Sequence, residues 1–462
     1  MKQELEQLRS NPEYRPSERE LDMFYKLFER YLETKDQTIV WEDIKPPTED
    51  KIIRYENLSA PEIADKKSLL SKLAVLKLNG GLGTTMGCEG PKSAIQVRNG
   101  RNFIDLCVKQ VEHLNKKYEV EVPLILMNSF NTDKTTQKII YKYDNIKTFN
   151  QSAFPRISDD TLLPLCSSYG DAGLYPPGHG DMFYSINFSG MLDELLQSGK
   201  EYMFVSNIDN LAATVDFKIL EHMADKNIDF LMEVTDKTRA DIKGGTLIEY
   251  NNSLCLLEIA QVPPDKKSEF TSVRKFKIFN TNSVWINLKV MKELVESESM
   301  LLDIIENKKS LPGLKERVIQ LETAMGAAIK FFPNACGVVV PRTRFLPVKT
   351  CSDLFLVESN LYLEDHGTLK MNPARPYPTI PLIKLLGKNF TKINNFIKCF
   401  KSIPCILELD HLTVSGNVKF GRCVVLKGTV IILADKRSSI KIPDGSIVVD
   451  SIIYGNLPII EH

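Results

Sequence analysis

The feature that most constrains the fold is an apolar segment followed at once by a cluster of glycines, over residues 73–93 (LAVLKLNGGLGTTMGCEGPKS). The segment LAVLKL, ending at Leu78, is typical of a buried parallel strand. The glycines that follow can expose backbone N–H groups, which is how many loops hold phosphate. Lys92, next to Pro91, adds a compact cation. For the glycines alone, a simple turn beside a surface lysine is the alternative.

Two familiar phosphate-binding motifs do not fit this segment. A P-loop needs Gly directly before Lys-Ser, where this chain has Pro91, and G-x-G-x-x-G starting at Gly81 meets Met86 at its last position. What remains, LNGGLGTTMG followed by GPKS, resembles the nucleotide-binding signature of the UTP-glucose-1-phosphate uridylyltransferase (UDP-glucose pyrophosphorylase) family. Further segments that are similar to the family follow in order almost to the C-terminus.

Composition bounds the class of protein. A chain of 462 residues suggests about three domains, or one large domain with two appendages. Lys plus Arg and Asp plus Glu are 59 each, so we expect no nucleic-acid or membrane partner. The nine cysteines form no C-x-x-C pair, and we see neither a signal peptide nor an apolar run of the roughly 18 residues that span a bilayer. We therefore expect a cytoplasmic protein with reduced thiols.

Three domains are predicted. Residues 1–70 form a helical appendage, in which Ser17 and Glu20 have capping-box spacing. Residues 71–384 alternate apolar runs with helical stretches, which predicts an α/β fold with ligands beyond the carboxyl ends of the strands. The resemblance implies a Rossmann-like, GT-A-like nucleotidyltransferase with a mixed sheet core. Residues 385–462 carry a six-residue repeat at Val418, Val424 and Val430, which suggests a parallel β-helix, as the family carries; a homo-oligomer could form through it.

Three residues are the main chemical candidates. Asp209 follows the apolar run MFVS and could hold Mg²⁺, although a turn or capping Asp is about equally common there. His179 lies among prolines and glycines in YPPGHGD, and a lone histidine is more often structural. Lys349 lies in VPRTRFLPVKT, where a solvated basic loop is the ordinary alternative. The resemblance assigns Asp209 to metal and nucleotide, His179 to the sugar phosphate and Lys349 to catalysis, and leaves Arg342 and Arg344 without a role.

The resemblance also assigns weaker sites. Asn207 contacts the sugar-phosphate side, Gly178 and Gln151 the uracil, and Met127 could floor the base site. The segment ETAMGAAIKFF, from Glu322, predicts a packed helix without chemistry. The nucleotide set is Leu78, Asn79, Gly80, Gly81, Lys92, Met127, Gln151, Gly178 and Asp209, and the sugar-phosphate set is His179, Asn207, Gly245, Glu258, Asn280, Asn282 and Lys349.

The reaction implied by the resemblance is UTP plus glucose 1-phosphate to UDP-glucose plus pyrophosphate, with Mg²⁺ and without a covalent intermediate. Lys92 would hold the triphosphate, and Lys349 would draw the attacking phosphate to the α-phosphorus. A pyrophosphorylase of broader or different sugar specificity is the nearest alternative. A non-catalytic scaffold that binds UDP-sugars is the other, and the presence of both lysines argues against it.

Overall fold

The computed structural model describes residues 1–462 except 12, 38, 239–243, 312–316, 436–437 and 456–462. Its centre is an eight-stranded sheet in which β14 runs antiparallel to its neighbours β11 and β10, while the other neighbouring pairs are parallel. The mixed α/β core expected from the sequence is confirmed. In spatial order the strands are β1 (Ile52–Arg54), β17 (Ala335–Val339), β11 (Phe230–Asp236), β14 (Ile278–Asn287), β10 (Tyr202–Asn207), β2 (Leu73–Leu78), β5 (Leu124–Asn128) and β6 (Ile146–Asn150).

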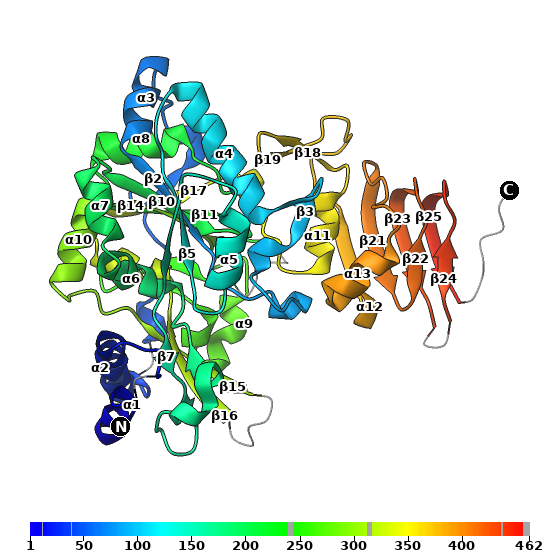
Figure 1. Ribbon diagram of the computed structural model, residues 1–462. Coiled ribbons are helices and arrows are strands. Elements are labelled where there is room, and N and C mark those ends of the chain that lie inside the picture. The colour runs from blue at the N-terminus through cyan, green and yellow to red at the C-terminus, as the bar shows by residue number, and fades with distance from the viewer. Residues whose placement is uncertain (12, 38, 239–243, 312–316, 436–437, 456–462) are drawn as a thin grey trace.

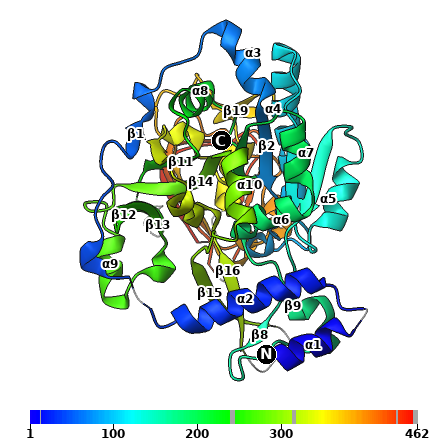
Figure 2. The same ribbon diagram turned by 90° about the vertical axis from the view of Figure 1, so that its left-hand side faces the viewer.

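Helices cover both faces of this sheet, because its strands are apolar on both sides (Figures 1 and 2). One face packs against α4 (Phe103–Tyr118), α8 (Phe217–Lys226) and α11 (Cys351–Glu358). The other packs against α6 (Met182–Phe188), α7 (Met191–Gln197) and α10 (Leu288–Glu296). The helices α3 (Ile63–Ser71), α5 (Asp133–Ile140) and α9 (Lys267–Phe270) complete the body.

The N-terminal helices α1 (Lys2–Arg9) and α2 (Glu18–Thr34) lie across one end of the body (Figure 2). The predicted capping box of α2 is confirmed, with Ser17 and Glu20 each accepting from the other's backbone N–H. The apolar face of α2 packs on a small sheet of β15 (Ile304–Ser310), β16 (Arg317–Thr323) and β8 (Ile157–Ser158). Residues 1–70 are not only a helical appendage, however, because β1 forms an edge strand of the central sheet.

The C-terminal strands form two parallel sheets beyond α11, at the right of Figure 1. The larger contains β20 (Leu382–Leu386), β21 (Leu409–Ser415), β23 (Val425–Leu433) and β25 (Ile447–Tyr454); the smaller contains β22 (Val418–Phe420) and β24 (Ile440–Ile442). The expected boundary at 384/385 falls inside β20, which pairs with β21, so a cut that keeps this strand whole lies before Leu382.

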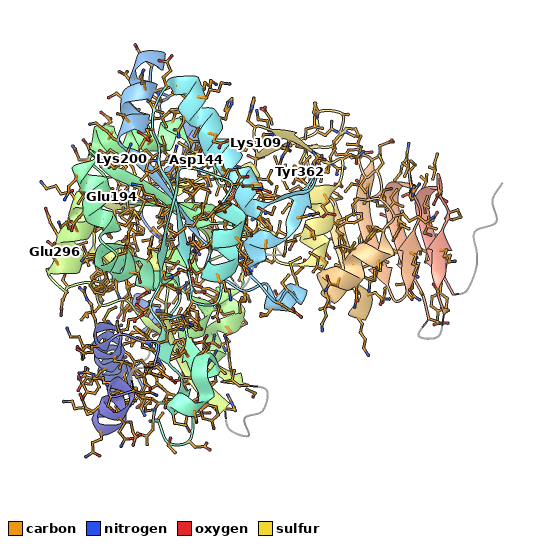
Figure 3. All side chains as sticks on the ribbon, in the orientation of Figure 1. Lys109, Asp144, Glu194, Lys200, Glu296 and Tyr362 are labelled. Atoms are coloured by element: carbon orange, nitrogen blue, oxygen red, sulfur yellow. The ribbon has the colours of Figure 1, made fainter. Side chains whose placement is uncertain are left out.

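The junction between the body and these sheets is apolar inside. One hydrophobic core runs from the central sheet through α11 and α13 (Ile393–Cys399) into the C-terminal strands. The hairpin of β18 (Tyr362–Asp365) and β19 (Thr368–Met371) lies beside it, and Figure 3 labels Tyr362 and, on α4, Lys109. Lys109 Nζ donates to Glu364 of this hairpin at 2.5 Å. In the described part of the chain, no helix has the length and apolarity that crossing a membrane requires.

Candidate active site

The candidate site is a cavity of about 450 Å³ at the edge of the central sheet where β2, β5, β6 and β10 end. Because β14 is antiparallel to these strands, its first residues reach the same edge. The predicted residues that line the cavity are Leu78, Asn79, Gly80, Gly81, Lys92, Met127, Gln151, Gly178, His179, Asn207, Asp209, Asn282 and Lys349.

The two predicted lysines meet at one carboxylate. Lys92 Nζ donates to Asp209 Oδ2 at 2.6 Å, and Lys349 Nζ donates to the same oxygen at 3.1 Å. The side chain of Lys92 is 14% exposed, whereas that of Lys349 is 57% exposed. Asp209 Oδ1 is buried and has no hydrogen-bond partner among the described residues. The site therefore has two cations that a polyanionic ligand can reach and one buried carboxylate oxygen without a hydrogen-bond partner among the described residues.

The glycine loop is shaped by close approaches. A Cβ built on Gly80 would lie 1.9 Å from Gln151 Nε2, so only glycine lets that amide reach this place. A Cβ built on Gly81 meets no described atom within 4 Å, so this backbone is open. Asn79 also holds the loop in place, because its Nδ2 donates to Asn128 and Thr136 and ties the loop to β5 and α5.

His179 is held in one tautomer. Its Nδ1 accepts from Met325 N at 2.9 Å, and burial, with a smaller effect of Lys349, lowers its pKa to about 4. The imidazole is therefore neutral near pH 7, and its hydrogen is on Nε2, 3.4 Å from Asn282 Nδ2. Gly178 precedes it at φ +87°, and a Cβ there would lie 2.7 Å from Thr323 O. His179 can thus donate a hydrogen bond but is a poor base.

Three predicted sugar-site residues form an adjacent group that does not line this cavity: Gly245, Glu258 and Asn280. A Cβ on Gly245 would lie 2.5 Å from Glu258 Oε1, and Asn280 N donates to Gly245 O at 2.8 Å. Burial raises the pKa of Glu258 to about 7. Asn280 Oδ1 accepts from Asn282 N at 2.8 Å, so the group continues the cavity wall through Asn282.

Sequence reasoning missed Pro176, Ile208 and Glu322, which also line the cavity. The expected helix from Glu322 is wrong at its start, because Glu322 and Thr323 end β16 and a 3₁₀ helix follows over Met325–Phe331. The small residues of this segment gave a helical pattern, while Glu322 belongs to the strand before it. Glu322 Oε1 accepts from Asn307 Nδ2 at 2.9 Å.

Bare glycine amides, two convergent ammonium groups and a free carboxylate oxygen at one sheet edge define a site for transferring phosphorylated groups. The comparisons identify the family. A model of the family described as UTP-glucose-1-phosphate uridylyltransferase matches residues 21–427, and the chain belongs to this family of nucleotidyltransferases.

Relatives and solved structures agree with this assignment. The chain is 65% identical to a protein of that name from Encephalitozoon cuniculi, over all of this chain and 92% of the relative. It is 54% identical to one from Saccharomyces cerevisiae, covering 96% of this chain and 90% of the relative. UDP-glucose pyrophosphorylase of Leishmania major, solved in open and closed forms, aligns with a TM-score of 0.87 at 33% identity over 98% of both chains. A variant of that enzyme, in complex with UDP-glucose, aligns at 0.85 and 34%, over 94% of this chain and 95% of its own.

Proposed function

We propose that this chain transfers the uridylyl group of UTP to glucose 1-phosphate and releases pyrophosphate, forming UDP-glucose. The observation that carries the proposal is the convergence of Lys92 and Lys349, from segments far apart in sequence, on Asp209 beside the glycine loop. Relatives of 65% and 54% identity carry the name of this reaction, which supports it.

The chain's own groups account for the transfer by positioning and charge. The sugar phosphate attacks the α-phosphorus of UTP in line, and pyrophosphate leaves on the opposite side. Two polyanions repel each other at contact distance, so the ammonium groups of Lys92 and Lys349 lower the barrier by neutralising them. His179 donates from Nε2 rather than removing a proton. The nucleophile needs no base, because the second pKa of a phosphate monoester is about 6.

The residues present fit Mg²⁺. The described residues contain no group of three or more His, Cys, Asp or Glu side chains suited to a metal, but Mg²⁺ is commonly held by one or two carboxylates together with substrate phosphates. Asp209 would hold it through the buried Oδ1. When bound, the ion supplies positive charge against the phosphates.

The metal assignment is tested by Asp209→Asn, which keeps the size of the side chain and removes its charge. We expect the Mg²⁺ concentration for half-maximal activity to rise several-fold, because an amide oxygen is a weaker ligand than a carboxylate. Asp225→Asn is the control, since Asp225 is exposed, pairs with Lys226 and does not line the cavity. An Mg²⁺ titration identical to that of the parent would contradict this role for Asp209.

We also propose that the C-terminal strands form a parallel β-helix through which copies of the chain associate. Both sheets are parallel, and the predicted repeat residues Val418, Val424 and Val430 are all fully buried, which supports inward-facing turns of a coil. A cytoplasmic location remains a proposal, supported by nine cysteines that are all free thiols.

Pyrophosphate release tests the function directly. With UTP and Mg²⁺, we expect release to require glucose 1-phosphate, with galactose 1-phosphate and N-acetylglucosamine 1-phosphate giving much slower turnover. Omitting the sugar phosphate provides the background. Comparable rates with all three sugars would favour a broad pyrophosphorylase, and binding of UDP-glucose without any pyrophosphate release would favour a scaffold.

A further inference from the structure

Arg344 is a buried cation that the proposed mechanism does not use. It precedes Lys349 in the loop after β17, and its side chain is 10% exposed. Its guanidinium makes a two-pronged contact with Glu233, Nε to Oε2 at 2.9 Å and Nη2 to Oε1 at 2.7 Å. It also donates to Asp216 Oδ2 at 3.3 Å and to Thr214 O at 3.0 Å. One side chain thus joins the Lys349 loop to β11 and to the segment that follows Asp209.

The partners of Arg344 are themselves fixed. Glu233 is 1% exposed and accepts from Trp285 Nε1 at 2.9 Å, on β14. Asp216 is the N-cap of α8 and also accepts from Tyr55 OH at 2.8 Å. Burial lowers the pKa of Arg344, but the charge and hydrogen bonds of Glu233 and the charge of Asp216 together outweigh it, so the pKa lies above the ordinary arginine value and the group stays charged. The anchor is a rigid, ionised network rather than a surface ion pair.

Hydrogen bonds join the loop between Arg344 and Lys349 to the segment that begins at Asp209. Leu346 N donates to Asn210 Oδ1 at 2.9 Å, and Leu346 O accepts from Leu211 N at 3.2 Å. Val348 N donates to Asp209 O at 3.0 Å. These bonds align the backbone of the loop with the backbone of the Asp209 segment. Arg344 fixes the loop at the end where this pairing starts.

Lys349 depends on that alignment. Its side chain is 57% exposed, and among the described residues its ammonium group donates one hydrogen bond, to Asp209. A long, solvated side chain has little packing of its own to hold it. Its position is therefore set by its backbone. A shift of about 1 Å in a group that orients reactants can lower turnover by about 100-fold.

We propose that Arg344 is a positioning residue for uridylyl transfer: by clamping the 342–349 loop to Glu233, Asp216 and the carbonyl of Thr214, it sets the place of the Lys349 ammonium group relative to Asp209. The inference rests on the proposed role of Lys349. The alternative is that the ion pair contributes only to folding, as many buried pairs do.

A double-mutant cycle separates these two readings. Arg344→Lys keeps the charge but loses the planar fork. We expect it to lower the single-turnover rate about 10- to 100-fold, while the dissociation constant for UTP changes less than about threefold. In a Lys349→Ala background, the same substitution should cost less than about twofold, because the group it positions is gone. Arg375→Lys is the matched control: Arg375 is also buried, donates to carbonyls at residues 406–409 in the C-terminal part, and should leave the rate unchanged.

Equal fold losses in both backgrounds, or an unchanged rate for Arg344→Lys, would overturn the inference. If Arg344→Lys does not fold, Glu233→Gln is put through the same cycle, with the same expected coupling and the same overturning result. Failure of this inference can be told apart from failure of the proposed function. A parent protein that releases no pyrophosphate rejects the function, and a fully active Lys349→Ala rejects the lysine's role and this inference with it. Additive losses with both of those intact reject the inference alone.

Discussion

Lys92 and Lys349 share a carboxylate oxygen but differ in how they are held. Lys92 is nearly buried at the end of the glycine loop, so it belongs to the floor of the site, whereas Lys349 is mostly exposed and can follow a ligand. An exposed cation whose only fixed contact is a carboxylate contributes little to stability. Lys349 is therefore better explained by what it does to a bound anion than by what it adds to the fold.

Removing the Lys349 ammonium should affect chemistry and spare the structure. We expect Lys349→Ala to lower kcat about 10²- to 10³-fold, the usual effect of losing one donor to a transition state, with a thermal unfolding temperature close to that of the parent. Steady-state pyrophosphate release at saturating UTP and glucose 1-phosphate measures it. Lys226→Ala, which changes an exposed lysine that pairs with its neighbour Asp225, is the control. A kcat within about twofold of the parent would reject the role.

Ionisation of Glu258 makes the stability of the fold depend on pH in a defined direction. Burial raises its pKa from an ordinary 4.5 to about 7, so the folded state binds more protons than the unfolded state between these values. Its contribution to stability is fully present below pH 4.5 and is lost as the pH rises through 7. We expect Glu258→Gln to remove the share of this decline that Glu258 contributes. Unfolding temperatures of parent and variant, compared between pH 4.5 and 8, test it, and parallel curves would contradict the shift.

His179 has the opposite sign and cannot mimic this decline. Its pKa is lowered from 6.5 to about 4, so its contribution to stability is present above pH 6.5 and is lost as the pH falls through 4. A decline with rising pH therefore cannot come from His179, whereas Glu358, whose pKa burial also raises to about 7, contributes one that Glu258→Gln leaves in place.

At the scale of the element, α11 links the catalytic loop to the body. It begins two residues after Lys349, and its capping box uses Thr350 and Asp353. Asp353 Oδ2 also accepts from Lys349 N at 2.9 Å, so the cap fixes the backbone of the lysine as well as the helix. α2 has an equivalent capping box at Ser17 and Glu20, and neither residue lines the cavity or contacts Lys349.

This pair of caps allows a controlled prediction. Thr350→Ala and Ser17→Ala should each destabilise the protein by about 1 kcal/mol, which lowers the unfolding temperature by about 1 °C in a chain of this length. Only Thr350→Ala should also lower kcat, by roughly 3- to 10-fold, because only its cap holds Lys349. Differential scanning calorimetry and pyrophosphate release measure the two effects. Equal kcat values for the two variants would show that α11 does not position the lysine.

The sequence predicted elements where local patterns are strong. The runs at Leu73–Leu78 and Leu124–Asn128 are apolar on both faces, which is what a strand covered by helices on both sides requires. The candidate functional residues that follow such strands could therefore be predicted, and most of them line one cavity. The resemblance to a family, rather than the pattern, supplied the particular residues.

Long-range pairing could not be predicted in the same way. Nothing in residues 52–54 indicates that β1 pairs with β17, which is almost 300 residues later. Likewise, Lys384 lies in β20, and its partner strand β21 comes only later in the chain. The role of Arg344 depends on Glu233, more than 100 residues away in sequence. Side chains that meet across the fold leave no periodic trace in a single sequence.

At the scale of the whole molecule, the feature that bears on assembly is the outer edge of the C-terminal sheet. The hydrophobic core extends from the central sheet into the C-terminal strands, so the two regions are packed together rather than linked loosely. β25 is an edge of the larger parallel sheet, and its outer edge has no strand partner among the described residues. It exposes Ile447 at 66%, Ile452 at 75% and Tyr454 at 61%.

A long edge strand with exposed apolar side chains is a template for pairing with another chain, unless charge or a covering segment blunts it. We expect self-association through β25, with each copy offering the same edge, because closed symmetric assemblies are the common outcome for soluble proteins. Ile452→Lys should convert the assembly to the monomer of 52.4 kDa, since a charge at the edge opposes pairing. Sedimentation velocity measures the mass.

The control is Ile397→Lys on α13, which changes an isoleucine that is 59% exposed in the same region but away from β25. It should leave the assembly intact, so that a general effect of added charge is separated from an effect at the edge. Pyrophosphate release by the Ile452→Lys monomer should remain within about twofold of the parent, because the residues that line the cavity all lie well before β25 in the chain. A parent protein that sediments as a monomer would reject association through this edge, and an Ile452→Lys variant that keeps the larger mass would place the interface elsewhere.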